Sequence, residues 1–153
     1  MMRRLAAWLT VAACCAVVSA CAQGGAPAAG ATAAMCPSSA AELPVEALYG
    51  AWEARIEGEA GIATVHLARH PDYEGSVRGT IDRHGGARAL LSGDIDDDGR
   101  LNLDESQDGR AISAVWSGDM QPGSCGKEFK GIWRNAKDDS KHPFTLTRTG
   151  GWQ

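Results

Sequence analysis

Residues 91–116 read LSGDIDDDGRLNLDESQDGRAISAVW, and this segment allows two interpretations that lead to different functions. As a metal loop it fits the calcium-binding pattern D-x-D-x-D-G-x5-E. As backbone geometry it is two β-hairpins, because turns that contain glycine separate short runs of alternating apolar residues. The candidate calcium ligands are Asp94, Asp96, Asp98, Asn102 and Glu105.

The alternation of apolar residues favours the first hairpin. A three-residue loop at residues 97–99, with Gly99 in the left-handed conformation, places Ile95 opposite Leu101. A two-residue loop would shift one strand by a single residue and turn its apolar side chains to the opposite face. The pattern therefore predicts the longer loop.

The next turn is expected to join a second hairpin to the first. A two-residue loop at Asp108-Gly109 sets Leu103 against Ala114 and Leu101 against Trp116, which keeps apolar side chains together. Both hairpins would then share one buried face. The β interpretation is therefore preferred to the metal loop.

Calcium loops of this pattern normally lie between two helices, and the flanking sequence opposes helices. Four glycines occur between residues 79 and 93, and Gly109 follows the loop. Glycine is a poor helix former. A calcium ion held by the aspartates at a hairpin tip remains the alternative, since carboxylate oxygens are the ligands that calcium takes. No other cofactor is expected.

The first 21 residues have the features of an export signal. Met1–Arg4 is basic, residues 5–18 are apolar, and Val18-Ser-Ala-Cys21 follows. This apolar core is shorter than the roughly 20 residues of a membrane span. Val-Ser-Ala-Cys resembles the lipobox of bacterial lipoprotein precursors, which implies cleavage before Cys21, acylation of that cysteine and transport to the outer membrane. An ordinary secreted protein cut near the same place is the alternative.

The sequence divides into a signal peptide at 1–20, a lipidated cysteine with an Ala/Gly-rich tether at 21–35, and one domain at 36–153. The tether has no large apolar residues to bury. Once the signal is removed and Cys21 is acylated, Cys36 and Cys125 remain, and they are expected to pair in an oxidising periplasm. Such a bridge would contribute roughly 4–5 kcal/mol in the chain-entropy model.

The fold class predicted for the domain is all-β. Short strands at regular spacing, with glycines in the turns, favour an antiparallel meander of about eight strands closed into a small barrel. A folded-over antiparallel sheet or a sandwich is the alternative. Glycines also occur within strands, as in Val77–Ile81 (VRGTI), and they indicate a bend or a close neighbour.

The chain resembles the calycin-type barrels, the group of lipocalins and avidins. The resemblance lies in Gly50-x-Trp52 on the first expected strand, Trp116-Ser-Gly on a later one, and Arg148 on the last. In lipocalins the tryptophan packs under an arginine of the final strand. The resemblance therefore implies a cation–π contact between Trp52 and Arg148.

Neither catalysis nor nucleic-acid binding is expected. His66 and His70, four residues apart on a strand, would lie about 13 Å from each other, too far to share an ion. Lys and Arg number 15 against 19 Asp and Glu, and two of the arginines lie in the predicted signal. This acidic balance disfavours a nucleic-acid partner.

The candidate ligand-binding residues are Trp52, Trp116 and Trp133, which would line a small apolar pocket if the barrel is open at one end. If it is not, they fill the core. The sequence thus predicts a non-catalytic, lipid-anchored lipoprotein of the bacterial cell envelope that binds a small apolar molecule. The alternatives are a filled module that binds or inhibits another envelope protein, and a calcium-binding protein that uses the loop 94–105.

Overall fold

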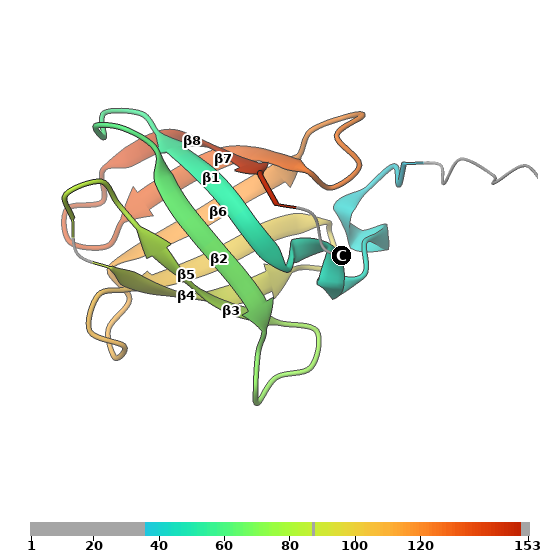
Figure 1. The fold of residues 1–153 in the computed structure, drawn as a ribbon, viewed down its shortest axis with the longest axis horizontal. Coiled ribbons are helices and arrows are strands. Elements are labelled where there is room, and N and C mark those ends of the chain that lie inside the picture. The colour runs from blue at the N-terminus through green and yellow to red at the C-terminus, as the bar shows by residue number, and fades with distance from the viewer. Residues whose placement is uncertain (1–35, 87, 151–153) are drawn as a thin grey trace, which may run out of the picture. The chain divides into compact units, whose positions relative to one another are not determined.

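The structure is a computed structural model and describes residues 36–86 and 88–150. Eight antiparallel strands follow one another in chain order and close into a barrel, since β1 pairs with both β2 and β8 (Figure 1). This confirms the predicted all-β meander and its closure. The strands are β1 (Gly50–Ile56), β2 (Ala63–Arg69), β3 (Val77–Asp82), β4 (Ala89–Ile95), β5 (Arg100–Ser106), β6 (Ala114–Met120), β7 (Glu128–Asn135) and β8 (Lys141–Arg148).

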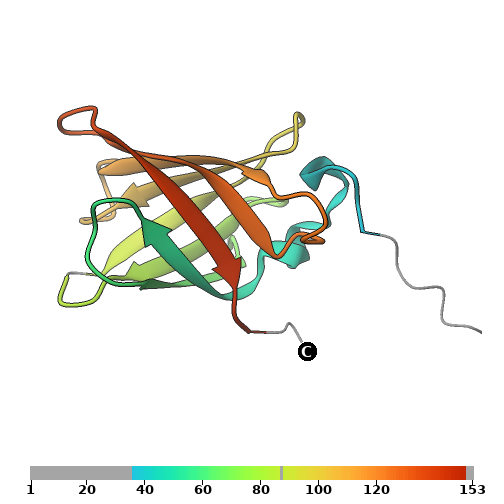
Figure 2. The ribbon, with the colours of Figure 1, turned by 90° about the horizontal axis from the view of Figure 1, so that it is seen from above.

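The two ends of the barrel differ. Two short 3-10 helices, η1 (Ala40–Glu42) and η2 (Val45–Leu48), lie at one end, called here the covered end (Figures 1 and 2). Leu48 of η2 is fully buried there. The loops β1–β2, β3–β4, β5–β6 and β7–β8 surround the opposite end, called here the open end. Within the described ranges, neither helix is long or apolar enough to cross a membrane.

The hairpin between β4 and β5 has the predicted register. Ile95 lies opposite Leu101. Gly99 has a φ of +81°, and its N–H donates to the carbonyl oxygen of Asp96 at 2.9 Å. The three-residue loop at 97–99 is confirmed.

The predicted register of the following hairpin is wrong by two residues. Leu103 faces Trp116 and Leu101 faces Gly118. The turn is longer than two residues because Asp108 Oδ1 accepts hydrogen bonds from the N–H groups of Arg110 and Ala111, at 2.8 and 2.9 Å. A shift of two preserves the face of every side chain, since strand side chains alternate with a period of two. It also gives Glu105 a place inside the barrel, opposite Ala114.

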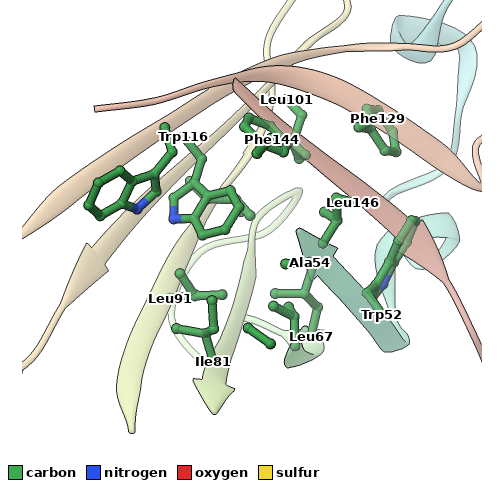
Figure 3. Packing of buried hydrophobic residues seen from close by; sticks show 14 of the residues in the cluster. Trp52, Ala54, Leu67, Ile81, Leu91, Leu101, Trp116, Phe129, Phe144 and Leu146 are labelled. Atoms are coloured by element: carbon green, nitrogen blue, oxygen red, sulfur yellow. The ribbon is translucent and has the colours of Figure 1, made fainter. Parts of the chain in front are cut away.

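The barrel interior is filled by side chains. Trp52, Trp116 and Phe129 are at most 1% exposed, and they belong to one continuous cluster of buried residues. Figure 3 shows Trp52 near Leu146, well apart from Trp116. Eight strands leave an interior just wide enough for such side chains.

The glycines within the strands allow the close approach of adjacent strands. A Cβ atom added at Gly79 would overlap the carbonyl oxygen of His66, and one at Gly131 would overlap that of Ser117. Each carbonyl belongs to the neighbouring strand. These glycines therefore leave room for a neighbour, which is one of the two reasons expected from the sequence.

Candidate functional site

Trp52 has a structural role at the covered end. Its indole N–H donates to the carbonyl oxygen of Leu48 at 2.9 Å. The guanidinium carbon of Arg148 lies 5.7 Å from the centre of its ring, which is the contact expected from the calycin resemblance. Arg148 donates in turn to the carbonyl oxygens of Ala47 and Tyr49, at 2.8 and 2.7 Å. Trp52 is thus enclosed by η2 and β8.

The other two candidate tryptophans meet at a buried carboxylate. The indole N–H groups of Trp116 and Trp133 both donate to Oε2 of Glu105, each at 3.1 Å. Trp116 is 1% exposed and Trp133 is 9% exposed. The structure therefore joins two of the three predicted ligand-binding residues, and Trp133 lines a surface hollow.

Arg83 completes this site. Its Nη1 and Nη2 atoms donate to the two carboxylate oxygens of Glu105, at 2.8 and 2.9 Å, and its Nε donates to Glu59 at 2.9 Å. Its guanidinium carbon lies 5.9 Å from the centre of the Trp133 ring. Desolvation lowers the pKa of Arg83, but the hydrogen bond and charge of Glu105, together with Glu59, outweigh it and raise the pKa. Arg83 therefore stays charged.

The sequence explains how this network forms, although its motifs did not single out Arg83 and suggested another role for Glu105. Leu101 and Leu103 point inward from β5, so Glu105 continues the same alternation. Arg83 directly follows β3, two residues after the buried Ile81. The signal in the sequence was that Glu105 occupies an inward-facing position of β5. A buried carboxylate needs a partner, so this position indicates a buried cation or hydrogen-bond donor nearby. No buried side-chain nitrogen or oxygen lacks a hydrogen bond in the part of the chain that the structure describes.

A hollow of about 650 Å³ lies above this network at the open end. The network forms part of its wall, together with residues of the β1–β2, β5–β6 and β7–β8 loops. Ile112 adds an apolar side chain that is 50% exposed. The lining residues are Glu59, Arg83, Ala89, Glu105, Gln107, Ile112, Ser113, Trp133, Asn135, Ala136 and Lys137.

The acidic loop at 94–105 does not bring its five candidate calcium ligands together. Glu105 lies inside the barrel with Arg83. Asp96 accepts hydrogen bonds from the N–H groups of Asp98 and Arg100, at 3.1 and 2.8 Å, and from Asn102 at 2.9 Å. These bonds, that of Arg100 foremost, lower the pKa of Asp96 despite desolvation. Over residues 36–86 and 88–150, no three His, Cys, Asp or Glu side chains are grouped to hold a metal ion.

Hydrogen bonds within the hairpin thus explain the position of the Asp96 carboxylate without an ion. Calcium binding by Asp94, Asp98 or their neighbours stays a prediction. A melting temperature that rises with calcium and falls with chelator would support it.

The predicted disulfide is present and joins Cys36 to Cys125, with their Cα atoms 4.7 Å apart. It ties the start of the domain to the β6–β7 loop at the covered end. The predicted signal peptide, Cys21 and the tether lie outside the described residues.

No family model matches the chain, and no curated protein matches it in sequence. The functional proposal is therefore built on the open-end site and the predicted lipobox.

Proposed function

We propose that this chain is a lipid-anchored, non-catalytic protein of the bacterial cell envelope, and that its calycin-like barrel binds a small molecule in the hollow at the open end. The observation that carries the proposal is the hollow itself, about 650 Å³ in volume beside Arg83, Glu105 and Trp133. Small-molecule sites typically measure about 300–1,000 Å³ and combine apolar walls with a few fixed polar groups.

Because the core is filled, we expect the ligand to bind at the mouth and not within the barrel. Trp52 and Trp116 are packed on all sides, and protein interiors leave few voids larger than a water molecule. Trp133 and Ile112 offer apolar surface to a ligand, while Gln107 and Asn135 offer amide groups. The ordered network beneath them fixes the shape of the hollow before a ligand arrives, which lowers the entropic cost of binding.

Binding in the hollow is tested with hexanol, a small neutral probe. Hexanol is titrated into isotope-labelled protein that carries Cys21→Ser and is therefore exported without its lipid. We expect the indole N–H resonance of Trp133 to shift saturably while that of Trp52 stays in place. Ala136 is exposed and lines the hollow, so Ala136→Trp should fill it and remove the response.

Ala68→Trp is the matched control, since Ala68 is exposed on β2 and lies outside the hollow. It should leave the response to hexanol unchanged. Equal responses in the two tryptophan variants would place binding elsewhere and overturn the assignment of the hollow.

The anchor rests on Val18-Ser-Ala-Cys21 and is supported by the Cys36–Cys125 disulfide, which is typical of proteins outside the cytosol. Labelled palmitate should be incorporated into the native chain and not into the Cys21→Ser variant. Membrane fractions should contain the native chain alone. Equal labelling or equal fractionation of the two proteins would refute the anchor.

A second proposal is that the same loops bind another envelope protein, as an interaction or inhibitor module. The filled interior favours it, because such a module needs no cavity. Exposed apolar side chains occur at Leu90 and Ile112, which line a smaller hollow of about 230 Å³ on the barrel wall. A purified envelope protein that binds the native chain and loses affinity for Ile112→Asp would support this function.

A further inference from the structure

We infer that the ligand of the open-end hollow is a small organic anion with an apolar body, and that its anionic group replaces Glu59 on Arg83. The inference rests on the proposed function and specifies the chemistry of the ligand. It follows from the different ways in which Glu105 and Glu59 bind the guanidinium group of Arg83.

Glu105 holds Arg83 permanently. It accepts two parallel hydrogen bonds from the guanidinium, and its side chain is 2% exposed. Its Oε2 also accepts the indole N–H groups of Trp116 and Trp133. Removing this carboxylate would leave a largely buried cation and two indole donors without partners, which is costly. An arriving ligand therefore leaves the Arg83–Glu105 pair intact.

Glu59 holds Arg83 by a single bond that a ligand can replace. Its carboxylate accepts from Nε at 2.9 Å, and its side chain is 33% exposed. It lies in the β1–β2 loop, outside any strand. The pair is partly exposed on the Glu59 side, and Arg83 keeps its two bonds to Glu105, so releasing Glu59 costs less than breaking the buried pair. Glu59 thereby marks a position at which the site accepts an anion.

The charges around the hollow favour an anion once Glu59 has moved away. Arg83 and Lys137 are then the lining cations and Glu105 is the lining anion, so one positive charge is in excess. Among the described residues, the side chain of Lys137 forms no ion pair. A cationic ligand would meet Arg83, whose guanidinium already lies over the ring of Trp133. The cation–π site is thus occupied.

The apolar body of the ligand has its own surface in the same hollow. Ile112 is 50% exposed and lies in the β5–β6 loop. Ala136 and Trp133 lie in the lining with it. A molecule that placed its anionic group on Arg83 and its apolar part against these side chains would use both kinds of surface.

Three six-carbon probes test the charge of the ligand: hexanoate, hexanol and hexylammonium. Each is titrated into the Cys21→Ser protein and followed at the indole N–H resonance of Trp133. We expect hexanoate to bind most tightly and hexylammonium most weakly. Glu59→Gln should tighten hexanoate binding about threefold, because the competing carboxylate loses its charge.

Glu57→Gln is the matched control, since Glu57 is an exposed glutamate two residues before Glu59 and does not line the hollow. It should leave hexanoate affinity unchanged. Tighter binding of hexanol or hexylammonium than of hexanoate, or weaker hexanoate binding in Glu59→Gln, would overturn the inference and leave the proposed function intact. If none of the three probes shifts Trp133, the proposed function fails as well.

Discussion

An arginine lies over a tryptophan ring at each end of the barrel. At the covered end Arg148 is 5.7 Å from the centre of the Trp52 ring, and at the open end Arg83 is 5.9 Å from that of Trp133. The partners of the two guanidinium groups differ. Arg148 donates to backbone carbonyl oxygens, whereas Arg83 donates to carboxylates.

This difference distinguishes the covered end, where the arginine has a structural role, from the open end, where we propose that a ligand replaces one partner of the arginine. The carbonyl oxygens that hold Arg148 are fixed by the backbone and carry no net charge. The carboxylate of Glu59 belongs to a side chain in a loop, so it can move and be replaced. The same pair of residue types is therefore held by fixed backbone oxygens at one end and, at the other, by side-chain carboxylates that include the one that the proposed anion would replace.

The largest effect is expected from removing the buried charge at the open end. Glu105→Gln keeps the size of the side chain but leaves Arg83 without its buried ion partner, so we expect a loss of about 3–5 kcal/mol in the free energy of unfolding, measured by urea denaturation. Asp104→Asn, on the outer face of the same strand, should change it by less than about 0.5 kcal/mol.

A double variant tests the origin of this loss. Arg83→Met combined with Glu105→Leu removes both charges and should recover the part of the loss that comes from the unpaired Arg83, while the indole N–H groups of Trp116 and Trp133 still lack an acceptor. A double variant as unstable as Glu105→Gln would show that the lost indole hydrogen bonds outweigh the relief of the unpaired charge.

Removing the disulfide is expected to loosen the covered end. Serine at both Cys36 and Cys125 removes a cross-link between residues 89 positions apart and should lower the free energy of unfolding by about 2–5 kcal/mol in chemical denaturation, a range whose upper part is the chain-entropy value. Hydrogen exchange at the Trp52 indole should accelerate relative to that at Trp133. Acceleration of Trp133 alone would contradict the separation of the two ends.

Arg148→Met tests the closure by backbone carbonyls. The change leaves the carbonyl oxygens of Ala47 and Tyr49 without their donor, so we expect a loss of about 1–3 kcal/mol. The loss should be the same at low and high salt, because no carboxylate is involved. Arg134→Met removes only a surface pair with Asp139 and should change stability by less than about 0.5 kcal/mol. A strong salt dependence of the Arg148 effect would be unexpected.

The smallest effect is expected at the β4–β5 hairpin, near the covered end, where the carboxylate of Asp96 accepts hydrogen bonds from two backbone N–H groups. Because the pKa of Asp96 is lowered on folding, its contribution is complete above the unfolded pKa and is lost as the pH falls through the folded pKa. Asp96→Asn should therefore lower the melting temperature at pH 7, and the difference from the native chain should shrink in acid. A difference that grows in acid would contradict this sign.

The alternation of apolar and polar side chains predicted most of the fold. It gave a wrong register at the β5–β6 turn, where a side chain forms hydrogen bonds with backbone N–H groups. Ile95 and Leu101 pair as expected because only one register buries both. The β5–β6 turn differs because Asp108 binds two backbone N–H groups and lengthens the loop. The same alternation contains the signal that Glu105 faces inward, although the sequence motif predicted this residue only as a calcium ligand. Its partner Arg83, 22 residues earlier, could not be predicted, because the curvature of the barrel brings the two together.

The order of the strands also has a consequence for how the chain folds. Each pairing along the meander joins consecutive strands, except the seam between β1 and β8. The bond from Arg148 to Ala47 spans 101 positions of the chain and lies beside that seam. Non-local contacts form slowly because a long loop must first be ordered. We therefore expect the seam to assemble late, so that Trp52 gains its protection from solvent after the hairpins have formed.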